Sequence, residues 1–426
     1  MKLPFLALFA LSCLTVHAQN FVCDAARVPK NAVRLSADAQ FSMTTPGFDL
    51  HTAPVVQKNS CASDTPFFFS VALPEGSYRV TVVLGTDQPS VTTVRAEARR
   101  LMLEKIETAA NHSATRVFDV NLRLPAIAGD EKHHVKLKPR EVGGLDWDGK
   151  LTLEFNGTHP GFRSIAIAPI HEPTIYLAGD STVVDQDVEP WAAWGQMLPR
   201  FFAPGVVIAN HGESGETVRS FESEQRFAKI FSQIQKGDTL FLQFGHNDQK
   251  PVNKVPLDLY KELLTKYIEK TRAAGATPVL VTSMFRRNFD AHGKIVDTMA
   301  GYPDAMRAVA AAEHVALIDL NAMSRTLFEA LGPEASRKAF MHYAANSFPN
   351  QTEAIDDDTH FNSYGAYELA RCIVEGIRSN RLPLAQKLAR DAGSFDPAHP
   401  DSLTSFQLPL TPIPAREGDV TKVPQI

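Results

Sequence analysis

The pattern of hydrophobic and polar residues changes once along the chain, near residue 170. Before that point the two kinds of residue alternate in short runs, which turn-forming residues separate. Alternation with a period of two is typical of strands with one buried face, and turns at short intervals favour antiparallel pairing. We therefore expect an all-β sandwich without helices over residues 19–172. Its clearest strands are predicted at residues 67–71, 78–84, 135–138 and 151–155.

After residue 173 the hydrophobic residues instead form short continuous runs. These runs begin 31, 33, 39 and 37 residues apart, which is the length of one strand and one helix, and amphipathic stretches at residues 257–274 and 302–312 fill two of the gaps. Buried parallel strands that alternate with helices make a three-layer α/β sheet, which we expect over residues 173–395. The remaining residues, 396–426, predict an extended tail. The strands are predicted at residues 175–177, 206–208, 239–242, 278–281 and 315–318.

The N-terminus has the pattern of a secretory signal. A basic Met1-Lys2 start precedes an apolar run over residues 3–16 and the sequence Val16-His17-Ala18. This order is typical of a cleaved signal peptide, and the run is shorter than the roughly 20 residues that span a bilayer. We expect removal of residues 1–18 and a secreted or periplasmic protein. The sequence Ala10-Leu11-Ser12-Cys13 leaves open a second hypothesis, a lipid anchor on Cys13.

Composition and charge exclude some classes of function. The 426 residues are 44% hydrophobic and 21% charged, as in an ordinary globular protein. The 43 Lys and Arg residues against 48 Asp and Glu residues give a net charge of −5, which lacks the basic field that nucleic-acid binding needs. No segment after the signal is long and apolar enough to predict a membrane span. We expect no nucleic-acid partner.

Three cysteines remain after removal of the signal: Cys23, Cys61 and Cys372. An oxidising compartment permits a disulfide, and a Cys23–Cys61 bond would close a loop inside the N-terminal region. Cys372 lies in an apolar helical pattern and is predicted as a small core residue. The cysteines are too scattered for a zinc cluster, and no His-Glu-x-x-His or nucleotide-binding glycine loop occurs. We therefore expect no cofactor and no metal.

Polar residues follow the predicted strands where the carboxyl ends of a parallel sheet would gather them. Residues 179–182 read Gly-Asp-Ser-Thr, residues 210–216 read Asn-His-Gly-Glu-Ser-Gly-Glu, and residues 245–248 read Gly-His-Asn-Asp. Residues 356–362, Asp-Asp-Asp-Thr-His-Phe-Asn, form a predicted loop before the last helix. One sheet edge therefore presents a hydroxyl, a glycine, an amide and a carboxylate–imidazole pair.

These side chains are the ones that acyl transfer requires. A serine such as Ser181 becomes a nucleophile when an imidazole takes its proton, and a carboxylate orients that imidazole. Asp357 precedes His360 by three residues, so one turn of loop can join the pair. The backbone N–H groups of Ser181 and Gly215 and the side-chain amide of Asn247 can bind the oxyanion.

Each of these motifs also has a simpler interpretation. A single Gly-Asp-Ser is a common turn, and the run of aspartates at residues 356–358 is typical of a solvated loop or a helix cap. His246 also follows a strand and has Asp248 nearby, so spacing alone does not separate it from His360 as the base.

Taken together, Gly179-Asp180-Ser181, Asn210 with Gly215, Gly245-His246-Asn247-Asp248 and Asp357-x-x-His360 resemble the four blocks of the SGNH (GDSL-type) hydrolases over about residues 173–380. Further segments are similar to the bacterial two-domain rhamnogalacturonan acetylesterases, in which a galactose-binding-like β-sandwich precedes a flavodoxin-like esterase domain. The resemblance implies Ser181 as nucleophile, His360 as base, Asp357 as its partner, and Ser181, Gly215 and Asn247 as the oxyanion hole. The quoted segments are 67–71, 101–104, 147–148, 179–183, 189–191, 194–195, 244–248 and 358–361.

One position departs from the family pattern. Fungal members carry Gly-Arg-Ser in the second block, whereas this chain has Gly215-Glu216-Thr217, so an acidic residue replaces a basic one. We expect a secreted serine esterase that removes O-acetyl groups from pectic rhamnogalacturonan through an acyl-enzyme on Ser181. The alternatives are an esterase of another acetylated glycan or small ester, such as acetylxylan or a sialate, and a carbohydrate-binding protein without activity.

Overall fold

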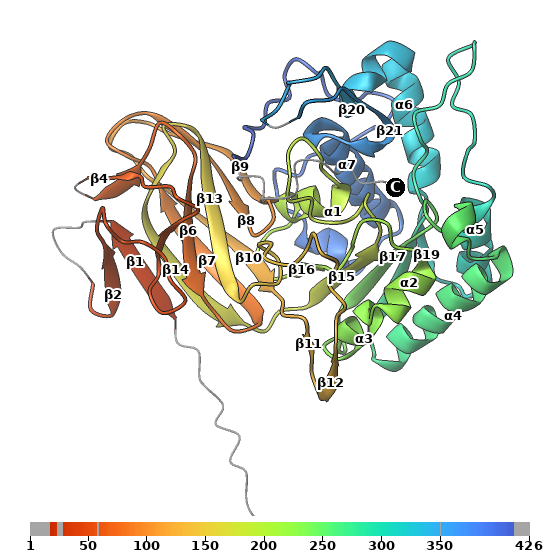
Figure 1. Ribbon diagram of the computed structural model, residues 1–426, viewed down its shortest axis with the longest axis horizontal. Coiled ribbons are helices and arrows are strands. Elements are labelled where there is room, and N and C mark those ends of the chain that lie inside the picture. The colour runs from red at the N-terminus through yellow and green to blue at the C-terminus, as the bar shows by residue number, and fades with distance from the viewer. Residues whose placement is uncertain (1–17, 24–28, 58, 350, 413–426) are drawn as a thin grey trace, which may run out of the picture.

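The computed structural model describes residues 18–23, 29–57, 59–349 and 351–412. Figure 1 shows an all-β region, red to yellow, beside an α/β region, green to blue. Residues 1–17 of the predicted signal lie outside the described residues, as do residues 413–426 of the predicted tail.

Two sheets form the all-β region. One sheet has the order β10-β7-β14-β1-β2, with β5 beside β14 and β4 beside β5, and the other has the order β3-β6-β13-β8-β9. Inward side chains from both sheets, such as Phe69 and Val80, make one hydrophobic core. Cys23 and Cys61 form the disulfide that the sequence left open. The strands are β1 (Gln19–Cys23), β2 (Ala32–Leu35), β3 (Gly47–Asp49), β4 (Val55–Gln57), β5 (Ser60–Ala62), β6 (Phe67–Ala72), β7 (Gly76–Leu84), β8 (Ser90–Ala96), β9 (Arg100–Thr108), β10 (Ala114–Leu122), β13 (Lys150–Thr158) and β14 (Gly161–Ile170).

The strand predicted at residues 135–138 is wrong. A hairpin of β11 (Ala126–Ile127) and β12 (Asp130–His134) ends at His134, and the chain then leaves the β region's sheets. The N–H of Lys136 donates to the carbonyl of Glu224 in the α/β region at 3.0 Å. Val135 is buried although the segment pairs with no neighbouring strand among the described residues, and its N–H donates to the carbonyl of Pro125 at 2.8 Å.

Five parallel strands, in the order β16-β15-β17-β18-β19, form the sheet of the α/β region. All five predicted runs coincide with these strands. In this order β15, the first strand in sequence, lies between β16 and β17, so the chain adds later strands on both sides of it. The polar loops that leave these neighbouring strands meet at the carboxyl edge of the sheet. The strands are β15 (Thr174–Gly179), β16 (Val207–Asn210), β17 (Thr239–Gln243), β18 (Thr277–Val281) and β19 (Ala316–Ile318).

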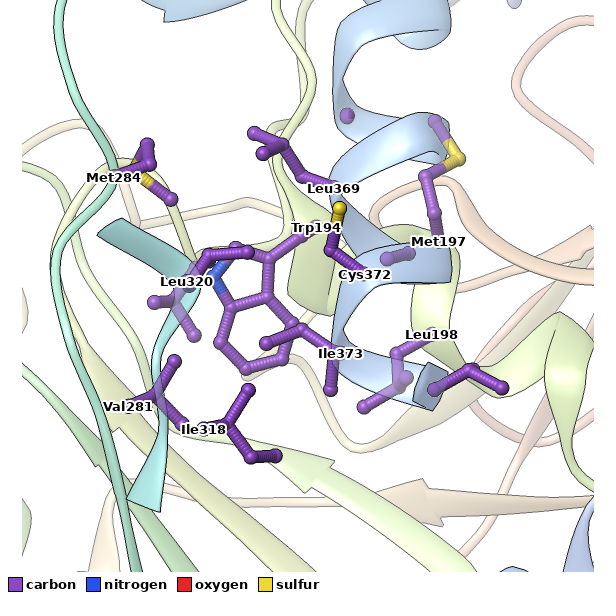
Figure 2. Packing of buried hydrophobic residues seen from close by; sticks show 14 of the residues in the cluster. Trp194, Met197, Leu198, Val281, Met284, Ile318, Leu320, Leu369, Cys372 and Ile373 are labelled. Carbon is purple, nitrogen blue, oxygen red and sulfur yellow. The ribbon is translucent and has the colours of Figure 1, made fainter. Parts of the chain in front are cut away.

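Hydrophobic side chains cover both faces of this sheet. One face packs against α1, α6 and α7, and the other packs against α2 to α5. Figure 2 shows the first face, where Trp194 and Cys372 lie among aliphatic side chains. Both side chains are therefore core residues. The helices are α1 (Trp194–Met197), η1 (Leu198–Phe201), α2 (Val218–Ser223), α3 (Arg226–Phe231), η2 (Pro251–Asn253), α4 (Leu257–Ala273), α5 (Tyr302–Ala312), α6 (Leu320–Ser336), η3 (Arg337–Ala339), α7 (Ser363–Ser379) and η4 (Pro383–Lys387).

Buried charge joins the two regions. Arg100 of β9 is almost fully buried, and it donates to Asp185 at 2.8 Å and to Asp146 at 2.9 Å. Asp185 follows β15 and also accepts a hydrogen bond from Asn210 at the end of β16, at 2.8 Å. The all-β region therefore contacts the two loops that leave the first two strands of the parallel sheet.

The described part of the tail, residues 396–412, returns to the all-β region. Phe406 packs against Tyr367 of α7, and Thr411 accepts a hydrogen bond from Arg95 of β8 at 3.0 Å. Thr411 also donates to Glu154 of β13 at 2.8 Å. These contacts attach the end of the described chain to the β-sheet region.

Candidate active site

Ser181 stands two residues after the end of β15. The carboxylate of Asp180 accepts hydrogen bonds from the backbone N–H of Thr182 at 3.0 Å and from its hydroxyl at 2.8 Å, which closes a tight turn. The turn directs the Ser181 hydroxyl toward the hairpin before α7, where its Oγ lies 2.9 Å from Nε2 of His360. The side chains of both residues are almost fully buried.

His360 lies on a strand, so the prediction of a loop at residues 356–362 is wrong. Strand β21 (Ile355–Phe361) pairs with β20 (Phe340–Tyr343). Phe340 pairs with Phe361 and Met341 pairs with Asp357, so one step along β20 spans residues 357–361 of β21. This bulge of residues 358–360 is the local structure that aims a ring at the serine, since bulges redirect side chains.

The carboxylate of Asp357 makes two contacts with His360 and one with Thr359. Its Oδ2 lies 2.6 Å from Nδ1 of the ring, and its Oδ1 accepts hydrogen bonds from the backbone N–H groups of Thr359 and His360 at 2.7 and 3.1 Å. Burial alone would raise the pKa of Asp357, but these hydrogen bonds and the charge of the imidazole lower it to about 2. The carboxylate is therefore ionised at neutral pH and accepts the ring proton on Nδ1.

The other two aspartates of this run have different partners. Asp356 lies 2.5 Å from Nδ1 of His342, and Asp358 lies 2.8 Å from Nε2 of the same ring. Asp358 also accepts a hydrogen bond from Arg287 at 3.0 Å. Of the three carboxylates, only that of Asp357 contacts His360 in the described structure.

His246 does not contact Ser181. Its Nδ1 lies 3.6 Å from Asp180, and within the described residues its ring nitrogens have no hydrogen-bond partner. Burial lowers the pKa of His246, against the opposing effect of Asp180. Its neighbour Asp248 accepts a hydrogen bond from the N–H of Val218, at the start of α2, at 2.9 Å. His360 therefore lies at hydrogen-bond distance from Ser181 and His246 does not, a difference that the spacing of the motifs did not reveal.

Two backbone N–H groups that the sequence predicts as oxyanion donors have no acceptor among the described residues. In the described part of the chain, the N–H groups of Ser181 and Gly215 donate no hydrogen bond. Ser181 is buried and Gly215 half-buried, and buried N–H groups without an acceptor are rare. Gly215 has φ +81°, a conformation that costs little only without a side chain. The amide of Asn247 donates one proton to the carbonyl of Glu216 at 3.0 Å, which leaves its second N–H available.

The sequence did not point to two further residues at this site. Lys138 and Arg140 come from the all-β region, and both donate to the carbonyl of Ser214, Lys138 at 2.8 Å. They also form ion pairs with Glu216 and Glu213 respectively. The only signal was the alternation of residues 135–138, which predicted a strand.

Over residues 18–23, 29–57, 59–349 and 351–412, no three His, Cys, Asp or Glu side chains are grouped as metal ligands. Over the same ranges, no helix has the length and apolar character to cross a bilayer.

Residues 177–367 match the GDSL-like Lipase/Acylhydrolase family. The chain is 43% identical to "Rhamnogalacturonan acetylesterase RhgT" of Bacillus subtilis over 221 residues, which are 51% of this chain and 95% of RhgT. It is 35% identical to "Probable rhamnogalacturonan acetylesterase YesY" of the same organism, over 51% of this chain and 98% of YesY. A longer match of 316 residues, 28% identical, covers 73% of this chain and 74% of "Uncharacterized esterase YxiM", also of B. subtilis.

Proposed function

This chain belongs to the GDSL-like lipase/acylhydrolase (SGNH) family and is a carboxylic ester hydrolase, and we propose that it removes O-acetyl groups from pectic rhamnogalacturonan. The observation that carries the proposal is the hydrogen-bonded chain from Ser181 through His360 to Asp357, with contacts of 2.9 and 2.6 Å. The names of RhgT and YesY support the choice of substrate.

The proposed reaction begins when Ser181 Oγ attacks the acetyl carbonyl and its proton moves to Nε2 of His360. Asp357 holds the ring so that Nε2 is the free acceptor, and it stabilises the imidazolium that forms. The N–H groups of Ser181 and Gly215 and the free N–H of Asn247 bind the oxyanion. The sugar hydroxyl leaves with the proton from His360, and water then attacks the acetyl-serine by the reverse proton transfers, releasing acetate.

Charge around the site is compatible with an anionic polymer. Asp356 and Asp358 are paired with His342, Arg287 and Arg337, and the two glutamates that flank Gly215 are paired with Lys138 and Arg140. A pectic chain with uronic carboxylates therefore meets acidic residues whose charge is already balanced. This supports pectin as substrate despite the acidic residue in the second block.

The proposal extends to domains and location. We propose a signal peptide at residues 1–18, a galactose-binding-like sandwich at 19–172, a three-layer flavodoxin-like hydrolase domain at 173–395 and a tail at 396–426, in a protein that is secreted or periplasmic. The Cys23–Cys61 disulfide supports export, because such bonds persist in oxidising compartments. N-terminal sequencing of the exported protein tests the cleavage after Ala18, and a mature chain that keeps residues 1–18 would contradict it.

Acetate release from acetylated rhamnogalacturonan tests the function. We expect release by the wild-type protein, loss in Ser181→Ala, and no change in Ser223→Ala, an exposed serine of α2. Acetylated xylan in parallel tests the alternative substrate. Release from xylan alone would reject the pectic substrate, and activity that survives Ser181→Ala would reject the mechanism. Failure of a fluorophosphonate to label folded protein at Ser181 would favour a carbohydrate-binding role without catalysis.

A further inference from the structure

A segment of the all-β region contacts the peptide that carries the Gly215 N–H, one of the proposed oxyanion donors. This bridging segment, residues 135–148, runs between β12 and β13 and contacts the loop that follows β16 and the start of α3. The N–H of Lys136 donates to the Glu224 carbonyl at 3.0 Å, and Arg226 donates to Glu141 at 2.6 Å. These contacts fix the segment's position, and Lys138 and Arg140 lie between them in sequence.

The two cations meet at one carbonyl oxygen. Lys138 Nζ donates to the carbonyl of Ser214 at 2.8 Å, and Nη2 of Arg140 donates to the same oxygen. The peptide that carries this carbonyl continues into the N–H of Gly215, one of the proposed oxyanion donors. A trans peptide is planar, and its C=O and N–H point in opposite directions. Two donors on the carbonyl therefore fix the direction in which the Gly215 N–H points.

The cations also change the strength of that donor. Each peptide unit is a dipole of roughly 3.5 D, and positive charge at its oxygen draws electron density from the nitrogen side. Hydrogen bonds from ionised donors are roughly twice as strong as neutral ones. The N–H of Gly215 becomes more positive and is held in place before the reaction begins, which is the condition for stabilising an oxyanion.

We infer that Lys138 and Arg140 are positioning residues of the esterase, which orient and polarise the Ser214–Gly215 peptide for oxyanion binding. The all-β region is thereby a part of the active site. The inference rests on the proposed function, because it takes the Gly215 N–H as an oxyanion donor.

The acidic residues on either side of Gly215 have a role in this arrangement. The Glu216 carboxylate is fully buried, pairs with Lys138 and accepts a hydrogen bond from Ser220 at 2.6 Å. Glu213 is also buried and accepts a hydrogen bond from Nε of Arg140 at 2.5 Å. Each glutamate holds its cation against the carbonyl of Ser214. This explains why the second block carries Glu216 where fungal members carry an arginine. In this chain the basic group comes from the bridging segment.

A matched pair of variants isolates Lys138. Lys138→Met alone would leave Glu216 buried without a counter-charge, so the comparison is between Glu216→Gln and the double variant Lys138→Met/Glu216→Gln. With 4-nitrophenyl acetate as substrate, we expect kcat in the double variant to be about tenfold below that of Glu216→Gln, with KM within twofold. Deletion of a whole oxyanion donor costs more, roughly 10²–10³ in kcat. Loss of kcat without a rise in KM marks an interaction made in the transition state, which a general loss of structure does not produce.

Four further measurements complete the test. Lys138→Arg keeps the cation and is expected to retain activity, and Lys136→Met, an exposed lysine of the same segment, is expected to match the wild type. The rate of labelling by a fluorophosphonate is expected to fall in parallel with kcat. The same comparison is made at Arg140, the more exposed cation, between Glu213→Gln and the double variant Arg140→Met/Glu213→Gln. This second pair decides the question if the Lys138 double variant does not fold.

The outcomes separate the inference from the proposed function. Equal kcat within both matched pairs, or a rise in KM at constant kcat, overturns the inference while Ser181-dependent activity remains. Activity at the wild-type level in Ser181→Ala rejects the proposed function, and the inference with it. A simple acetate ester makes this distinction because its hydrolysis requires the oxyanion hole but not recognition of pectin.

Discussion

Replacing Asp357 by asparagine removes the charge from a carboxylate that lies 2.6 Å from Nδ1 of His360. The pKa of Asp357 is lowered from 3.8 to about 2, which corresponds to roughly 2 kcal/mol of net preference for the ionised carboxylate in this site. Asparagine also presents an N–H to Nδ1, so the ring must keep its proton on Nε2, where it cannot accept the proton of Ser181. Loss of the correct tautomer typically lowers kcat by about 10⁴. We expect a loss of that size, about 5.5 kcal/mol in barrier height.

The assay is kcat for 4-nitrophenyl acetate in Asp357→Asn between pH 5 and pH 9. The control is Asp358→Asn, because this neighbouring carboxylate contacts Arg287 and His342 and leaves His360 untouched. We expect the control to stay within threefold of the wild type, and we expect no titration of Asp357 in this range, because its pKa lies near 2. A loss below tenfold in Asp357→Asn, or an equal loss in Asp358→Asn, would refute the assignment of Asp357 as the orienting carboxylate.

Three further predictions concern stability. Arg100→Met leaves the buried carboxylates of Asp146 and Asp185 with Arg123 as their remaining cation, so the free energy of unfolding measured in urea should fall by about 3 kcal/mol; a fall below 1 kcal/mol would contradict the role of this ion cluster in joining the regions. Removing the Cys23–Cys61 bond, whose cysteines are 38 residues apart in sequence, should cost about 4 kcal/mol, and the double serine variant should no longer respond to a reductant. Burial raises the pKa of Asp248 from 3.8 to about 7, so the folded protein keeps a proton that the unfolded chain loses. The free energy of unfolding should therefore decline as pH rises from about 4 to about 7, and Asp248→Asn should remove that part of the decline.

Local patterns of hydrophobic and polar residues predicted most of the strands and helices. The five hydrophobic runs of the second half all became parallel strands, since a run of apolar residues reports burial on both faces of a sheet. The prediction of a strand at residues 135–138 failed because alternation reports burial and not strand pairing, and Val135 is buried here without a neighbouring strand among the described residues. At residues 356–362 the error was the reverse, a loop predicted in place of a strand. The polar residues there predicted a loop, whereas pairing with β20 makes a bulged strand.

The sequence by itself determined the order of the four motifs, the two folding patterns and the set of side chains suited to acyl transfer. Tertiary structure alone decided which histidine faces Ser181, because His246 and His360 both have an aspartate nearby in sequence and only the fold places the His360 ring beside the Ser181 hydroxyl. It also brought Lys138 and Arg140 to the Ser214 carbonyl, 76 and 74 residues away in sequence. Local patterns record whether a residue is buried. They do not record what it is buried against, and at this site that contact decides the chemistry.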